Sequence, residues 1–455
     1  MDRIEKRILE IIDENADRII AFGDDIWRHA ELGFKEFRTA EKYSSAMVEL
    51  GLKPETGIAI TGSKTYLKKK TEGEVMISLM GEMDALPISN HPEAWSETGA
   101  VHACGHNAQL TGVMGAAIAL TDPEVVASLG GNVCFISMPA EEQGSMKPED
   151  KKEYKKSGKI EYFGGKVEFM YEGAMDDIDL VVGHHVMGDG IQYGNGNGSS
   201  WGFMDKDVIF TGRATHIGTA NDGVDTQAAA VLAINAINAQ REGLPRFYKP
   251  NRHLVHAAIL SGAKAINIVE DHTQMTVNYR GMSIESLKDL DYRIGRAIKG
   301  AAIAMGAGAD IQTVFGYMPY LTVKDASVID EVFGIMDPEG KHPIVHYENT
   351  GCSDYGDLSQ IMPVLQFFTG GHNGEPEHST TFSVGDPYEY YIAPAKGFAL
   401  LAYRLLKDNA SLAKRIIADN PPKMSIADYF NMINKLSHKE VVLMEPAPYN
   451  DYLGL

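Results

Sequence analysis

Four strand-like apolar runs in this 455-residue chain each lead into side chains that bind metals or transfer protons. In open α/β sheets, ligands bind beyond the carboxyl ends of the strands, so residues that follow different strands can share one crevice. The runs are EVMISLM, NVCFISM, IDLVVG and MPVLQFFTGG, and the residues after them are Glu82 and Asp84, Glu141 and Glu142, His184 and His185, and His372 and His378. The segment VHACGHNAQ, which follows the first run, adds Cys104 and His106. This pattern predicts a metal site at one edge of a sheet.

Length and composition limit the class of protein. A chain of this length exceeds one ordinary core and predicts two domains. The net charge of −20 disfavours nucleic acid and anionic membrane surfaces as partners, because phosphate binding needs clustered Lys and Arg. No uncharged apolar stretch approaches the roughly 20 residues that span a bilayer. Three widely spaced cysteines argue against a disulfide framework, so we expect a cytoplasmic enzyme.

The fold class follows from the order of patterns along the chain. The first 200 residues alternate strands with helices at about 2–22, 37–51 and 107–120, which predicts an α/β domain with a mostly parallel sheet flanked by helices. Residues 201–316 follow the β-α-β-β-α-β order of a ferredoxin-like unit, inserted into that domain. The larger domain would then comprise 1–200 and 317–455, with a helix at about 393–407 and a charged tail from about 408. The Lys-rich segment 144–172 is interpreted as a surface insertion, with a charged lid as the alternative.

Each candidate residue can also be explained without a metal ion. Gly105 permits a tight turn between Cys104 and His106, and a helix N-terminus favours a thiolate, which together suit zinc. A buried cysteine beside a core histidine, or a cysteine nucleophile with a histidine base, would use the same residues. In the Glu141–Glu142 pair, one carboxylate can bind metal while its neighbour faces water. His184 and His185 are rivals, as are His372 and His378, and only one of each pair should face the crevice.

In these residues the chain resembles the M20 metallopeptidase family, specifically its amidohydrolase branch, which includes hippurate, auxin-conjugate and aminobenzoyl-glutamate hydrolases. The resemblance covers about residues 5–407. It is carried, in order, by the segments DDIWRHAELGFKEFRTAEKY, MDALPI, HACGH, PAEEQG, GHHV, GRATHIG with GVDTQAAA, and HSTTF.

The resemblance implies a dinuclear site. Two divalent ions, zinc ahead of manganese, cobalt or nickel, would be held by Cys104, His106, Glu142, His185 and His378. Glu141 would be the general base, and Asp84 would orient a metal-bound imidazole.

The inserted domain would serve as lid and dimerisation domain, so that the protein is a homodimer. His216 would reach the neighbouring subunit's active site and stabilise the oxyanion that develops during hydrolysis. Asn267 and Arg280 would bind the substrate's carboxylate.

Some positions depart from the family pattern. Asn107 and Gln109 stand in CGHNAQ where the family has CGHDGH, and Ser353 precedes Asp354 where an acid is usual. These departures leave the substrate and metal preferences open. The reaction we expect is hydrolysis of the amide bond of an N-acyl or aryl-acyl amino acid by metal-activated water. The alternatives are a dipeptidase or aminopeptidase of the same fold, a catalytically silent member that binds metal or ligand, and a cysteine hydrolase using Cys104.

Overall fold

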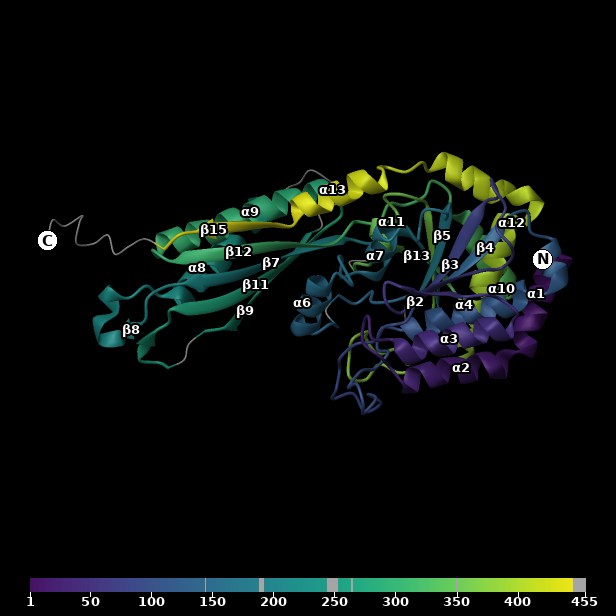
Figure 1. The fold of residues 1–455 in the computed structure, drawn as a ribbon, viewed down its shortest axis with the longest axis horizontal. Helices are drawn as coiled ribbons and strands as arrows, with labels where there is room; N and C mark the ends of the chain where they lie inside the picture. The colour runs from purple at the N-terminus through teal and green to yellow at the C-terminus, as the bar shows by residue number, and fades with distance from the viewer. Residues whose placement is uncertain (144, 188–191, 244–252, 263–264, 349–350, 445–455) are drawn as a thin grey trace. The chain divides into compact units, whose positions relative to one another are not determined.

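A computed structural model describes residues 1–143, 145–187, 192–243, 253–262, 265–348 and 351–444. The chain forms two compact units (Figure 1). The larger unit comprises the described residues of Met1–Ser199, Leu321–Asn349 and Asp357–Met424. The smaller unit comprises those of Ser200–Tyr320, Thr350–Gly356 and Ser425–Leu455.

The larger unit is built on an eight-stranded mixed sheet in the order β1-β2-β4-β3-β5-β14-β6-β13. Its central strands β4, β3, β5 and β14 run parallel, and β13 is parallel to β6. Every residue of β3, β4 and β14 is buried, as expected where both faces of a sheet are covered. The predicted α/β fold with a mostly parallel sheet is thus confirmed. The strands are β1 (Glu55–Ile58), β2 (Gly62–Tyr66), β3 (Met76–Glu82), β4 (Asn132–Met138), β5 (Leu180–Val186), β6 (Tyr193–Ser199), β13 (Ile344–Glu348) and β14 (Val364–Thr369).

Helix α4 is central to the helices of this unit: it packs against β3 and contacts α1, α2 and α12. All residues of α4 are buried, and most of them from Leu110 onward are apolar, as expected for a helix covered on every side. The helix predicted at about 2–22 is divided at Asn15, whose side-chain amide donates to the Ile11 carbonyl and ends the first helix. The helices are α1 (Arg3–Glu14), α2 (Ala16–Arg28), α3 (Phe37–Glu49), α4 (His106–Leu120), α5 (Pro123–Ala127), α6 (Pro148–Ser157), α7 (Gly165–Tyr171), α10 (Ser327–Met336), α11 (Tyr355–Leu358, at the boundary between the units), the π-helix η3 (Tyr388–Ile392) and α12 (Ala393–Asp419), which is kinked at residues 407–410.

The interpretation of 144–172 as a surface insertion was wrong for its second half. Helix α6 carries the exposed lysines, but residues 165–170 of α7 are buried. A Cβ atom on Gly165 would lie 1.7 Å from the Pro139 carbonyl oxygen, so glycine is needed for α7 to pack this closely on the chain after β4. Periodicity could not reveal this close contact, because it depends on a distant strand.

The smaller unit contains the predicted β-α-β-β-α-β order as β7-α8-β9-β11-α9-β12, which forms an antiparallel sheet. Helices α8 and α9 pack against each other and against β7 and β11 (Figure 1). The sequence pattern places the tail after residue 408 in the larger domain, but its strand β15 pairs with β12 and extends this sheet, so residues from Ser425 belong to the smaller unit. The elements are β7 (Gly202–Thr211), β8 (Thr215–His216), η1 (Ile217–Asp222), α8 (Thr226–Ala239), η2 (Arg241–Gly243), β9 (His253–Ser261), β10 (Ile268–Val269), β11 (His272–Gly281), α9 (Ile284–Ala304), β12 (Gly308–Tyr317), α13 (Ile426–Leu436) and β15 (His438–Val442).

Among the described residues, no helix combines the length and the apolar character that crossing a membrane requires.

Candidate metal centre

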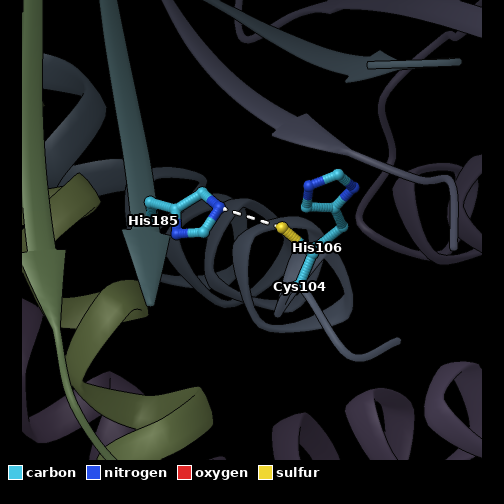
Figure 2. A group of neighbouring side chains, drawn as sticks. All are labelled: Cys104, His106 and His185. Carbon is cyan, nitrogen blue, oxygen red and sulfur yellow. Dashed lines mark hydrogen bonds between the residues drawn. The ribbon is translucent and has the colours of Figure 1, made fainter. Parts of the chain in front are cut away.

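The five side chains predicted as ligands gather in the larger unit, around the Cys104 sulfur. Cys104 Sγ lies 3.5 Å from His185 Nε2 and 3.3 Å from His378 Nε2. His378 Nε2 is 3.1 Å from Glu142 Oε1. The ligand atoms of Cys104, His106 and His185 lie within 4.8 Å of one another, and so do those of Cys104, Glu142 and His378. Figure 2 shows the first group, with the His185 ring pointing toward the sulfur.

Each donor reaches this place from a different element. Cys104 immediately precedes the N-cap Gly105 of α4, and His106 is the first residue of that helix. Glu142 lies in the loop after β4, and His185 is the penultimate residue of β5. His378 lies in the loop after β14, and its backbone N–H donates to the Ala103 carbonyl at 2.8 Å. Three carboxyl ends of parallel strands and one helix start therefore converge, as the strand-end argument predicted.

The backbone at the site adopts conformations that few residue types tolerate. Gly105 has φ 77°, which glycine adopts without steric cost. Ala140 and His378 have φ 48° and 61°, unusual for residues with a Cβ. Such strain persists where the surrounding structure enforces it, and it is concentrated at functional sites.

Hydrogen bonds orient two imidazoles toward the cluster. His106 Nδ1 donates toward both the carbonyl and the Oδ1 of Asp84, at 3.0 and 3.1 Å. The other Asp84 oxygen accepts the Glu142 backbone N–H at 2.8 Å. His185 Nδ1 donates to the Val186 carbonyl at 2.7 Å. Both rings therefore present Nε2, the arrangement that a hydrogen bond from Nδ1 to a carboxylate or a backbone carbonyl imposes on metal-binding histidines.

The donor set fits a cation. His106 Nε2 is buried and has no hydrogen-bond partner, although the carboxylate of Glu82 lies 3.2 Å away and that of Glu141 3.9 Å away. Burying an unsatisfied polar atom among carboxylates is costly unless a positive charge is shared between them. One sulfur, three imidazole nitrogens and a carboxylate are ligands that zinc and neighbouring transition metals accept.

The pKa shifts of Cys104, Glu142 and His378 follow from their burial and from their contacts with one another. Burial, together with the charge of Glu142, raises the pKa of the Cys104 thiol well above its usual value. Burial therefore opposes the thiolate that a helix N-terminus favours, and a bound cation would favour it again. The hydrogen bond to Glu142 raises the pKa of His378. Burial alone would raise the pKa of Glu142, but the contacts with His378 and His106 lower it.

The structure shows which histidine of each pair lies at the candidate metal centre. His184 is fully buried, its Nε2 lies 2.8 Å from Thr369 Oγ1, and burial lowers the pKa of its ring well below the usual value. His372 stacks on Phe382 with ring centroids 5.2 Å apart. Of each rival pair, only His185 and His378 have a ring nitrogen at the Cys104 sulfur.

Two residues without an assigned role lie at the same place. Glu82 is the last residue of β3, and one of its side-chain oxygens accepts a hydrogen bond from Gln109 Nε2 at 2.8 Å. Its other oxygen lies 2.5 Å from Lys166 Nζ. Lys166 gave no signal of its own in a Lys-rich segment. Gln109 and Asn107 both depart from the family pattern, and Asn107 donates to the hydroxyl of Tyr391.

The remaining predicted residues belong to the smaller unit. His216 is an exposed residue of β8, and its Nδ1 accepts the Gly218 backbone N–H at 3.0 Å. The carbonyl of Asn267 accepts the Ile217 N–H, and Arg280 on β11 donates from Nε to Asn278 Oδ1. Their functional roles stay predictions.

Residues 78–390 match Peptidase family M20/M25/M40, so the match covers more than half of the chain. The chain belongs to this family. That finding confirms the resemblance and assigns the coarse class, a metal-dependent hydrolase of amide or peptide bonds.

Relatives within the family point to more than one reaction. The chain is 24% identical to N-acetylcysteine deacetylase of Bacillus subtilis, over 86% of this chain and 97% of the relative. It is 25% identical to thermostable carboxypeptidase 2 of Saccharolobus solfataricus, over 85% and 95%. Among solved structures, a Bacillus subtilis protein described as a dinuclear metal-binding peptidase of the M20 family superposes with a TM-score of 0.64 at 22% identity, covering 87% of this chain and 99% of that one. This last similarity supports the fold.

Proposed function

We propose that this protein is a two-metal amidohydrolase that cleaves the amide bond of N-acyl or aryl-acyl amino acids. The observation that carries the proposal is the convergence of five donor side chains on the Cys104 sulfur, with Glu141 beside them. The deacetylase relative acts on an N-acetyl amino acid by its name, which supports the substrate class. A cytoplasmic location is proposed with it, because Cys104, Cys134 and Cys352, which all lie in the described part of the chain, form no disulfide bond.

The groups of neighbouring ligand atoms suggest how the five ligands would be divided between two ions. Cys104, His106 and His185 would hold one ion, and Cys104, Glu142 and His378 the other, so that the thiolate belongs to both groups. Zinc is the first expectation for this sulfur and nitrogen set, with manganese, cobalt and nickel as alternatives. When bound, such ions polarise a carbonyl oxygen and lower the pKa of water.

Glu141 is the proposed general base. It is buried, its carboxylate lies 3.9 Å from His106 Nε2, and it belongs to a cluster with His106 and Glu82. The preceding residue, Ala140, is held in its positive-φ conformation by donating its N–H to Glu36 Oε1 at 2.9 Å. Glu141 would take a proton from the attacking water and deliver it to the leaving nitrogen.

The smaller unit would complete the site as a lid in a homodimer. In His216 the ring Nδ1 accepts a backbone N–H, so Nε2 carries the proton in the neutral ring and can donate to an oxyanion of the partner subunit's substrate. Asn267 and Arg280 would bind the substrate carboxylate, since an arginine guanidinium pairs well with a carboxylate. Closure of such a lid would exclude water from the reacting amide.

The test replaces the base while keeping the ligands. Glu141→Ala should abolish hydrolysis of every N-acyl amino acid while bound metal, quantified in the same sample, stays at the wild-type level. Glu97→Ala, which removes an exposed carboxylate, serves as the control and should retain activity. Turnover by Glu141→Ala at more than a few per cent of wild type would exclude this base.

A peptidase of the same fold is the second candidate, favoured by the carboxypeptidase relative. Dipeptides and their N-acetyl analogues should be compared on the wild-type protein. Faster cleavage of the free-amine dipeptides would favour the peptidase. Wild-type protein that binds metal but cleaves neither series would instead be a silent family member.

A further inference from the structure

A buried lysine lies against the predicted metal centre. Lys166 and Glu82 are 0% and 1% exposed, and Lys166 Nζ lies 2.5 Å from Glu82 Oε1. Lysine is almost never fully buried unless it is paired, so this contact accounts for its position. Lys166 follows Gly165, whose N–H donates to the Ala140 carbonyl at 3.1 Å, directly before Glu141. The lysine is therefore anchored to the same stretch of backbone that presents the Glu141–Glu142 pair.

Through Glu82 the lysine reaches a third cluster of ligand atoms. The Glu82 oxygen not bound to Lys166 accepts Gln109 Nε2 at 2.8 Å and lies 3.2 Å from His106 Nε2. Ligand atoms of Glu82, His106 and Glu141 all lie within 4.8 Å of one another. His106 Nε2 thus borders two sets, one containing the Cys104 sulfur and one rich in carboxylate oxygens.

The two sets differ in the cations they favour. Thiolate with imidazole suits zinc, whereas carboxylate oxygens suit harder ions such as Mn²⁺ and Mg²⁺. An ammonium group that already neutralises one carboxylate opposes a second cation at the same place, because like charges repel most strongly where water is excluded.

We infer that Lys166 is a positioning residue that sets metal preference: it holds Glu82 out of the coordination sphere, so that His106 serves the sulfur-containing set. This inference rests on the metal centre proposed above. Removing the lysine charge leaves the Glu82 carboxylate without its ammonium partner, beside His106 and Glu141. The oxygen-rich set then becomes a better site for a hard cation.

The experiment measures metal affinity and does not depend on turnover. Metal-free wild type, Lys166→Met and Lys166→Gln are titrated with Zn²⁺ and with Mn²⁺ against a competing chelator. Both variants should raise the ratio of Mn²⁺ to Zn²⁺ affinity at least about tenfold. The Gln variant covers the case in which Lys166→Met does not fold, since its amide can still donate a hydrogen bond to Glu82. The double variant Glu82→Gln/Lys166→Met should return the ratio to the wild-type value, because residue 82 then carries no negative charge.

The matched control is Lys64→Met. Lys64 is also buried and paired, at 2.5 Å from Asp177, but Asp177 belongs to none of the three clusters, so the loss of Lys64 should not change the ratio. A ratio within threefold of wild type in folded Lys166 variants would overturn the inference, as would a shift that persists in the double variant or appears in Lys64→Met. Wild type that binds neither ion would refute the metal centre itself, whereas metal-binding wild type with an unchanged ratio in the variants would refute only the role of Lys166.

Discussion

Asp84 connects two of the predicted ligands, and its replacement by asparagine tests the geometry of the site. One of its oxygens accepts His106 Nδ1 at 3.1 Å, and the other accepts the Glu142 backbone N–H at 2.8 Å. Asparagine keeps the shape but has only one side-chain oxygen, so its amide N–H₂ must face one of these two donors. Asp84→Asn should therefore misorient either the imidazole or the carboxylate that it supports.

The magnitude follows from one lost hydrogen bond. A hydrogen bond to a charged group contributes about 1.5–3 kcal/mol, and a further donor facing a donor adds to the loss. At about 1.4 kcal/mol per factor of ten, the metal affinity should fall roughly tenfold to a hundredfold. The fold should survive, because Asp84 is buried at a strand end and its volume is unchanged.

A competition titration of the metal-free protein with a chromogenic chelator measures this loss. Asp179→Asn is the control, since Asp179 accepts the Met76 N–H at 2.8 Å at the opposite end of β3, where no predicted ligand lies. The control should change affinity less than twofold. If Asp84→Asn is folded and binds metal as tightly as wild type, the reasoning that Asp84 orients the ligands is refuted.

Two further predictions concern packing and pH. Gly165→Ala should lower the free energy of unfolding in urea by about 2–4 kcal/mol, because a Cβ 1.7 Å from the Pro139 oxygen forces α7 away and breaks a backbone hydrogen bond. The control Gly334→Ala lies in helix α10, where an added Cβ would meet no neighbouring atom within 4 Å, and it should raise the free energy of unfolding by about 0.5–1 kcal/mol. Equal stability of the two variants would contradict this reasoning. Burial raises the pKa of Cys104, and Glu82 and Asp84 raise that of His106 although burial alone would lower it, so both ligands keep protons near neutral pH and must release them to metal. Metal affinity measured at pH 6, 7 and 8 should therefore rise about tenfold per pH unit for each proton released, and a pH-independent affinity would be the contrary result.

Much of the site was predictable because its signals are local. A run of apolar residues that ends in a carboxylate or a histidine can be read without knowing what lies beside it, and the topology of a parallel sheet then brings such ends together. The Cys104–Gly105–His106 turn also has a local cause, since glycine at φ 77° begins α4. The tail strand β15 was missed because an edge strand is identified only by the partner it pairs with, here β12.

The amino-acid sequence by itself determined the α/β class, the inserted β-α-β-β-α-β unit and the residue types of the donor set, because periodicity and side-chain chemistry are properties of short segments. Only the tertiary structure decided that His185 and not His184 turns toward the sulfur, that the Cys104 thiol has a raised pKa, and that Lys166 pairs with Glu82. These outcomes depend on which groups from distant segments approach within a few ångströms. Burial and charge act over that distance, and no local pattern records it.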